Sequence, residues 1–278
     1  METEKKSISI LGCGWLGVPL AKHLMHKGFL VKGSVTSEEK FGLLTQAGID
    51  PFRIIVSDTE VIIDDPDFFH ADVLIISIPP KRIEDIDLVF PSQIRRLIPF
   101  ILNAGIQKVI FISSTSVYPE KNQIAREDDF LVPDKASGRA LLEAEELFRE
   151  IAELKTTIIR FGGLIGVDRN PGRFLMKSSK PIEDAPVNLI HQDDCIEIIS
   201  SIIDNDLWGE TLNAVCPEHP MKKDFYQQAA KQAGYSVLIV SEQNASFKIV
   251  DSSKLIHLLD YQFIYSSPMD YLDALSET

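Results

Sequence analysis

The sequence predicts an α/β protein whose strands form a doubly wound parallel sheet, and three observations lead to this fold class. Short runs rich in β-branched residues alternate with longer stretches of helical period, which is the pattern of parallel strands covered by helices. The runs VLIISI (73–78) and VIFIS (109–113) are apolar rather than alternating, as expected of central strands buried on both faces. Beyond residue 161 the regularity weakens, so we expect a smaller carboxyl-terminal lobe there.

The expected elements follow from these runs in chain order. Strands are expected at SISIL (7–11), FLVKGSV (29–35), FRIIV (52–56), DVLIISI (72–78), KVIFIS (108–113) and TTIIRF (156–161). Helical period predicts the connecting helices near residues 15–27, 38–47, 91–104 and 135–154. The later part is broken into short elements by Pro171, Pro181, Pro186, Pro217 and Pro220, with one helical stretch at 193–204.

The length of the chain allows one domain or two unequal ones, since 278 residues with 45% hydrophobic side chains can bury a large core. We expect residues 1–166 to form the larger domain, with residues 187–216 threaded back into it. Residues 167–186 and 217–278 are expected to form the substrate-side lobe.

Composition excludes several classes of partner. Asp and Glu outnumber Lys and Arg by 41 to 28, and the net charge of -13 would repel nucleic acids and anionic membranes. The 3 cysteines lie far apart, which fits neither a disulfide framework nor a zinc site. No segment stays apolar for the ~20 residues of a membrane span. We therefore expect a cytoplasmic protein with a small-molecule substrate. The composition leaves open whether the protein forms a homo-oligomer.

The stretch LGCGWLG (11–17) carries three glycines spaced as G-x-G-x-x-G, after a strand and before a helix. Gly12 would allow the tight turn, Gly14 would let the backbone approach a pyrophosphate, and Gly17 would let the helix pack closely. The amino end of a helix favours an anion. We expect a Rossmann-type dinucleotide site that also includes Cys13, Trp15 and Leu16, the alternative being a turn without a ligand.

Cofactor choice depends on the end of the second strand, GSVTSEEK (33–40). Thr36 and Glu39 have the spacing of a capping box, which would occupy Glu39 structurally. Ser34, Thr36 and Ser37 would then face the ribose and tolerate a 2′-phosphate, although this segment contains no arginine to pair with one. The segment favours NADP over NAD.

The end of the fourth expected strand, with Ser77, Ile78 and Pro79, lies where ligands gather in an open α/β sheet. We expect these residues to line the far ribose of the cofactor. A Pro-Pro turn without ligand contact is the alternative.

Further motifs follow in order along the chain. They are SSTSVY (113–118), Glu127 and Pro133 ahead of SGRA (137–140), Glu145, RFGGLIG (160–166), IHQDD (190–194) and the stretch 248–275. Together with the glycine loop they resemble an extended or atypical short-chain dehydrogenase/reductase of the nucleoside-diphosphate-sugar epimerase/dehydratase group. The resemblance implies bound NAD(P), with Ser113 and Phe161 also at the cofactor, and a sugar-like or other carbonyl substrate.

The family's catalytic tyrosine and lysine are replaced here. Aligned on Gly138 and Glu145, their positions hold Ser137 and Leu141, and neither a serine hydroxyl nor leucine can move the proton as a phenol beside a lysine does. The resemblance assigns Ser114 to the substrate oxygen, the alternative being a serine bonded to backbone. Tyr118 could face the substrate or pack.

Other polar residues near these motifs receive structural interpretations. Lys135 and Arg139 fall off the apolar stripe of their helix and are expected at the surface. His191, Asp193 and Asp194 suggest half a metal site, but Asp193 is better explained as a helix cap, so we expect no metal. Two hypotheses remain, an NAD(P)-dependent oxidoreductase or epimerase with a degenerate site, and a protein that binds NAD(P) without turnover.

Overall fold

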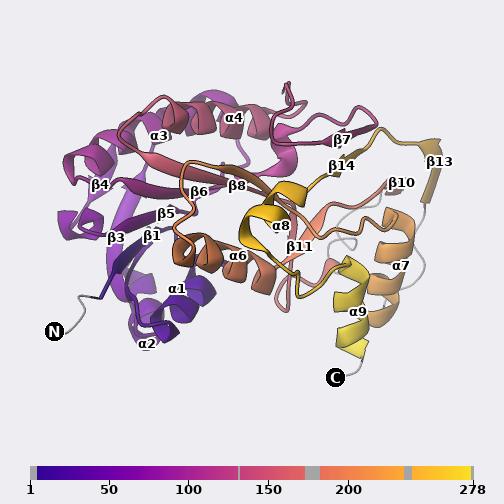
Figure 1. The fold of residues 1–278 in the computed structure, drawn as a ribbon, viewed down its shortest axis with the longest axis horizontal. Helices are drawn as coiled ribbons and strands as arrows, with labels where there is room; N and C mark the ends of the chain where they lie inside the picture. The colour runs from indigo at the N-terminus through magenta and orange to yellow at the C-terminus, as the bar shows by residue number, and fades with distance from the viewer. Residues whose placement is uncertain (1–4, 131, 173–181, 235–239, 277–278) are drawn as a thin grey trace. The chain divides into compact units, whose positions relative to one another are not determined.

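The computed structural model describes residues 5–130, 132–172, 182–234 and 240–276, and the chain forms two compact units (Figure 1). The amino-terminal unit comprises Met1–Val117, Pro133–Ile159 and Ile199–Thr211. The carboxyl-terminal unit comprises Tyr118–Val132, Arg160–Ile198 and Leu212–Thr278. These units divide the chain differently from the expected domains, because residues 118–132, 160–166, 187–198 and 212–216 belong to the carboxyl-terminal unit. Pro181 lies outside the described residues.

The central sheet has 8 strands in the order β12-β8-β6-β5-β1-β2-β3-β4. Their bounds are β1 Ser7–Leu11, β2 Leu30–Val35, β3 Asp50–Val56, β4 Val61–Ile63, β5 Val73–Ile76, β6 Lys108–Ser114, β8 Lys155–Phe161 and β12 Thr211–Ala214. β1 pairs in parallel with β2 and β5, and the parallel pairing continues to β3 and β6. The doubly wound sheet is confirmed, and β4, which runs antiparallel to β3, is an addition to it.

Helices cover both faces of this sheet (Figure 1). α3 (Ile86–Asn103) and α4 (Ala136–Arg149) lie on one face, and α1 (Gly17–His26) and α2 (Phe41–Gln46) lie on the other. α3 begins earlier than the expected residue 91 because Pro91 lies inside the helix rather than at its start. Strand β5, Val73–Ile76, is buried throughout, as the apolar run predicts.

The carboxyl-terminal unit contains three parallel strand pairs, which are β7 (Gln123–Ala125) with β14 (Lys248–Val250), β9 (Gly163–Ile165) with β11 (Leu189–His191), and β10 (Ile182–Asp184) with β13 (Val240–Asn244). The helices with described bounds in this unit are α7 (Lys222–Gln232), α8 (Ser253–Leu259), α9 (Pro268–Ser276) and the first part of α6 (Gln192–Asp204). Phe225, Tyr271 and Leu272 pack with Ile165 and Leu189 in one apolar core.

The start of α6 is organised by His191 and Asp194. α6 begins at Gln192, and His191 Nδ1 accepts a hydrogen bond from the Asp193 backbone N–H at 3.2 Å. The expectation that Asp193 caps this helix is therefore wrong, because the capping acceptor belongs to His191. Asp194 is fully buried and accepts bonds from the Tyr261 hydroxyl at 2.8 Å and the Ile264 N–H at 2.7 Å.

Within the described part of the chain, no group of three or more His, Cys, Asp or Glu could hold a metal ion.

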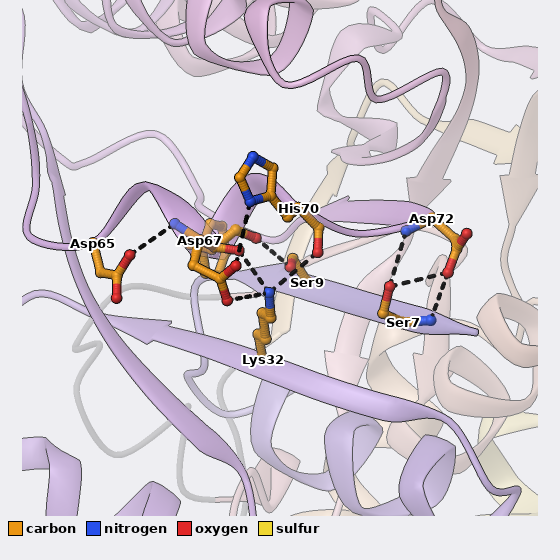
Figure 2. A network of polar contacts seen from close by, with 8 residues as sticks. Ser7, Ser9, Lys32, Asp65, Asp67, His70 and Asp72 are labelled. Atoms are coloured by element: carbon orange, nitrogen blue, oxygen red, sulfur yellow. Dashed lines mark hydrogen bonds and ion pairs between the residues drawn. The ribbon is translucent and has the colours of Figure 1, made fainter. Parts of the chain in front are cut away.

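A polar network ties the central strands to the 3₁₀ turn η2 (Pro66–Phe69), as Figure 2 shows. Lys32 on β2 donates from Nζ to Asp67 Oδ2 and the Asp67 carbonyl, both at 2.6 Å, and to the His70 carbonyl at 3.1 Å. Asp65 caps the turn by accepting from the Asp67 N–H at 2.8 Å. The ammonium lowers the pKa of the Asp67 carboxyl. Lys32 therefore holds the turn against the sheet.

Replacing Lys32 by methionine is expected to lower the free energy of unfolding by about 1–2 kcal/mol, since three hydrogen bonds are lost while the apolar stem is kept. Denaturant titration of the purified protein measures this change. Lys22→Met, on the exposed side of α1, is the matched control. Equal unfolding free energies for the two variants would show that the network contributes nothing to stability.

No helix in the described ranges combines the length and the apolar character that crossing a membrane requires.

Candidate dinucleotide-binding site

The loop between β1 and α1 needs glycine at two of its three positions for reasons of packing. Gly12 has φ +103°, and a Cβ there would lie 2.8 Å from the Ser77 carbonyl oxygen. A Cβ on Gly17 would lie 2.6 Å from the Gly12 carbonyl oxygen. Gly12 therefore makes the tight turn and Gly17 brings the helix against it, as the sequence predicts.

Gly14 differs from these two because the fold does not require it. Its backbone lies outside the left-handed region, and a Cβ there would meet nothing within 4 Å. The space beside Gly14 is open and lies at the amino end of α1, which begins at Gly17. Unpaired N–H groups and the helix dipole favour an anion at such a position. The loop therefore fits a pyrophosphate, which needs this space.

Ser34 on β2 holds the glycine loop through two hydrogen bonds from the loop's backbone N–H groups. The Ser34 hydroxyl accepts from the Gly12 N–H at 3.0 Å, and its carbonyl accepts from the Cys13 N–H at 2.8 Å. Ser34 is buried at 2% exposure, so its hydroxyl holds the loop on β2, which differs from the expected ribose contact. Burial raises the pKa of the Cys13 thiol to about 12, so the thiol stays protonated.

The residues after β2 do not form the expected capping box. The 3₁₀ turn η1 (Glu38–Lys40) begins with Ser37 at its N-cap, and no side chain caps it. Thr36 and Glu39 are both exposed. The prediction that Glu39 is occupied by Thr36 is therefore wrong, because the turn starts one residue later than that pairing requires.

An arginine lies beside this segment, on the neighbouring strand. Val35, the last residue of β2, is the register partner of Arg53 on β3. Arg53 Nη1 lies 3.6 Å from Glu38 Oε1 and 3.2 Å from Asp64 Oδ2. The segment at the end of β2 itself contains no arginine, and Arg53 was overlooked because it lies on the neighbouring strand β3. The charged residue inside the run FRIIV was the signal that could have shown it.

The segment after β5 lies against the glycine loop. The Ser77 N–H donates to the Leu11 carbonyl at 2.8 Å, and Ile78 Cγ2 lies 3.0 Å from the position of a Gly12 Cβ. Chain order reverses between β1 and β5, which is where open α/β sheets bind ligands. Ser77 and Ile78 are half-buried and Pro79 is exposed at this edge.

Ser113, at the end of β6, is tied to α4. Its hydroxyl donates to Glu145 Oε1 at 2.6 Å, and Arg149 Nη2 donates to the other oxygen of Glu145 at 3.0 Å. Glu145 is fully buried, so the arginine neutralises a carboxylate that would otherwise be costly to bury. The Ser113 hydroxyl therefore joins strand to helix, which differs from the expected cofactor contact.

Packing at Gly138 brings the first turn of α4 against the turn that follows β6. A Cβ on Gly138 would lie 2.2 Å from the Ser116 carbonyl oxygen. In that turn the Ser114 hydroxyl accepts from the Ser116 N–H at 3.2 Å, the backbone alternative named for this serine. Next to Gly138, Ser137 is half-buried, and Leu141 is 4% exposed. Ser137 and Leu141, which are expected at the family's tyrosine and lysine positions, thus lie on the inner side of α4.

The outer side of α4 is polar, as expected. Lys135 is exposed, and Arg139 Nη2 lies 2.8 Å from Asp87 Oδ2.

Tyr118 belongs to a buried network within the carboxyl-terminal unit. Its hydroxyl donates to Asn213 Oδ1 at 2.7 Å and accepts from Arg160 Nη1 at 2.7 Å. Burial raises the pKa of Tyr118 to about 12. Of the two alternatives for Tyr118, the structure shows packing, because the hydroxyl is already bonded and the phenol is a weaker acid than usual. Phe161, at the end of β8, is also buried.

Comparison with known proteins gives relatives along the whole chain. Protein YeeZ of Escherichia coli (strain K12) is 31% identical over 269 residues, which cover 95% of this chain and 98% of YeeZ. No family model matches the chain.

Solved structures share the fold at lower identity. A conserved protein of unknown function from Silicibacter pomeroyi has a TM-score of 0.80 at 19% identity, covering 98% of this chain and 99% of its own. UDP-glucuronic acid 4-epimerase from Bacillus cereus, solved with UDP-glucuronic acid and NAD, has a TM-score of 0.77 at 20% identity and 98% coverage of both chains. The chain thus has the fold of the epimerase/dehydratase and short-chain dehydrogenase/reductase proteins, and it belongs to the family of Protein YeeZ.

Proposed function

We propose that the protein binds a nicotinamide dinucleotide at the loop between β1 and α1. The observation that carries this proposal is Gly14, a glycine that neither the backbone conformation nor the packing requires and that leaves open space at a helix amino end. Gly12 and Gly17 hold the loop, and Ser77 and Ile78 flank it. When bound, NADP or NAD would supply hydride transfer.

The proposed substrate is a sugar-like compound or another small carbonyl compound. The solved neighbour that holds a nucleotide sugar together with NAD supports this class, although the likeness is one of fold. Ser114, whose hydroxyl accepts from the Ser116 N–H, would still have its O–H free to donate to the substrate oxygen. Because Leu141 carries no charge, no cation at that position lowers the pKa of a proton donor, and Ser137 is itself a far weaker acid than a phenol. Water or another group must therefore carry the proton.

A second function, binding of the cofactor without turnover, is favoured by the same two residues. Ser137 and Leu141 retain the inner positions of α4 but not the chemistry. Incubation with NADPH or NADP, a panel of carbonyl compounds and nucleotide sugars, and product analysis would separate the two functions. Conversion of any substrate at a rate above that of the protein-free control would exclude the binding-only function.

For the cofactor itself we propose NADP(H) over NAD(H). Calorimetric titration of the wild-type protein is expected to give NADPH an affinity at least equal to that of NADH. Ser37→Asp is expected to shift the preference towards NADH, since the new carboxylate would repel a 2′-phosphate and accept from a free 2′-hydroxyl. A wild-type protein that prefers NADH by tenfold, about 1.4 kcal/mol, would contradict this prediction.

A further inference from the structure

Arg53 brings a positive charge to the end of β2 from the neighbouring strand β3 rather than from the loop that follows β2. Arg53 is paired in register with Val35, the last residue of β2, and its guanidinium lies 3.6 Å from Glu38 in η1. In a doubly wound sheet the ribose of the adenosine half is bound at the end of the second strand. Arg53 therefore stands beside the place where NAD and NADP differ.

The two carboxylates that hold Arg53 are not equivalent. Asp64 lies at 3.2 Å and donates its backbone N–H to the Arg53 carbonyl at 3.3 Å, so it belongs to the strand pair that carries the arginine. Glu38 lies farther away, at 3.6 Å, and its side chain is 70% exposed. An ion pair that is this exposed is weak because water screens it. Glu38 is therefore the partner that an incoming anion can replace.

We propose that Arg53 is the residue that recognises the 2′-phosphate of NADP(H), and that Glu38 competes with that phosphate for the guanidinium. A phosphate monoester carries about two negative charges and matches the planar donors of arginine better than a single carboxylate does. NADP(H) exchanges the Glu38 contact for a phosphate contact, while Asp64 continues to orient the arginine. NAD(H) has no phosphate there and leaves the Arg53–Glu38 pair in place.

This inference rests on the proposed function, and it predicts opposite effects for the two partners. Arg53→Gln is expected to weaken NADPH binding at least tenfold and to change NADH binding less than twofold. Glu38→Gln is expected to strengthen NADPH binding severalfold, because the competing charge is gone, with NADH again little changed. An arginine or glutamate that only stabilises the fold would not produce this reciprocal pattern.

Calorimetric titrations of the wild-type protein and the two variants with NADPH and NADH test the proposal. Adenosine 2′,5′-bisphosphate and adenosine 5′-monophosphate, titrated alongside, isolate the contribution of the 2′-phosphate. Arg95→Gln is the matched control, since Arg95 forms an exposed ion pair with Glu143 at 3.2 Å on the helices and its loss removes the same charge elsewhere in the unit. Arg53→Lys, which keeps the charge but not the planar fork, is expected to fall between the wild type and Arg53→Gln.

The outcomes separate the two proposals. If the wild-type protein binds both dinucleotides and Arg53→Gln weakens them equally, the role of Arg53 is overturned and the dinucleotide site stands. If no dinucleotide binds to the wild-type protein, the proposed function itself is overturned. Should Arg53→Gln fail to fold, the Glu38→Gln variant still decides, because an unchanged affinity for NADPH overturns the competition.

Discussion

Replacing Gly14 by aspartate is expected to abolish dinucleotide binding and to leave the fold intact. The new Cβ meets nothing within 4 Å, and the residue has no need of a left-handed backbone, so the loop can accept the side chain. The carboxylate then occupies the open space at the amino end of α1 and repels a pyrophosphate there. We expect at least a hundredfold loss of affinity in calorimetry, about 2.7 kcal/mol, with an unchanged melting temperature.

Two further glycine variants complete this experiment. Gly42→Asp adds the same side chain on α2, where a Cβ also meets nothing within 4 Å, and is expected to bind as the wild type does. Gly12→Ala is expected to unfold more readily, because its Cβ would lie 2.8 Å from the Ser77 carbonyl oxygen at a φ of +103°. Retention of full affinity by Gly14→Asp would remove the observation on which the proposed function depends.

The double change Ser137→Tyr and Leu141→Lys is expected to create or raise hydride transfer from NADPH to a small carbonyl compound. The two positions lie four residues apart on the inner side of α4, and the close packing of Gly138 against Ser116 holds the first turn of that helix in place. The added phenol can donate a proton, and the added ammonium lowers its pKa. Loss of NADPH absorbance with product formation measures the reaction.

The control is a second double variant, Ser137→Phe with Leu141→Lys. Its side chains have nearly the same volume and charge as those of the tyrosine variant, but they lack the hydroxyl. Leu141 is 4% exposed, and overpacking of such a position can cost roughly 1–3 kcal/mol, so both variants must first be shown to be folded and to bind NADPH. Equal rates for the tyrosine and phenylalanine variants would mean that Ser137 does not face the reacting end of the cofactor.

The sequence predicts the central sheet well because the apolar run that marks each central strand lies within that strand. Long apolar runs such as those of β5 and β6 are typical of strands in the middle of a sheet. β4 carries no such signal, since Val61–Ile63 is a three-residue strand of half-buried residues that follows β3 in an antiparallel pair. The early start of α3 was missed for a different reason, because Pro91 stands inside a helix rather than at its beginning.

In the site, the glycine loop could be predicted because its three glycines act within one turn. Ser34 and Arg53 could not be assigned in the same way. The bond from Gly12 to Ser34 and the pairing of Val35 with Arg53 exist only once β1, β2 and β3 lie side by side, and residue spacing says nothing about such neighbours. Tyr118 is a similar case, since its partner Asn213 comes 95 residues later in the chain.

Asp194 sets an order in which the carboxyl-terminal unit can be completed during synthesis. Its partners Tyr261 and Ile264 are synthesised 67 and 70 residues after it. The amino-terminal unit ends at Thr211 and includes neither Tyr261 nor Ile264. Until residue 264 has been made, burial of the Asp194 carboxylate would lack these two hydrogen bonds, and an ion buried without partners is strongly disfavoured. The start of α6 therefore reaches its final packing only after Tyr261 and Ile264 have been synthesised, and a chain truncated before residue 261 is expected to keep this carboxylate hydrated.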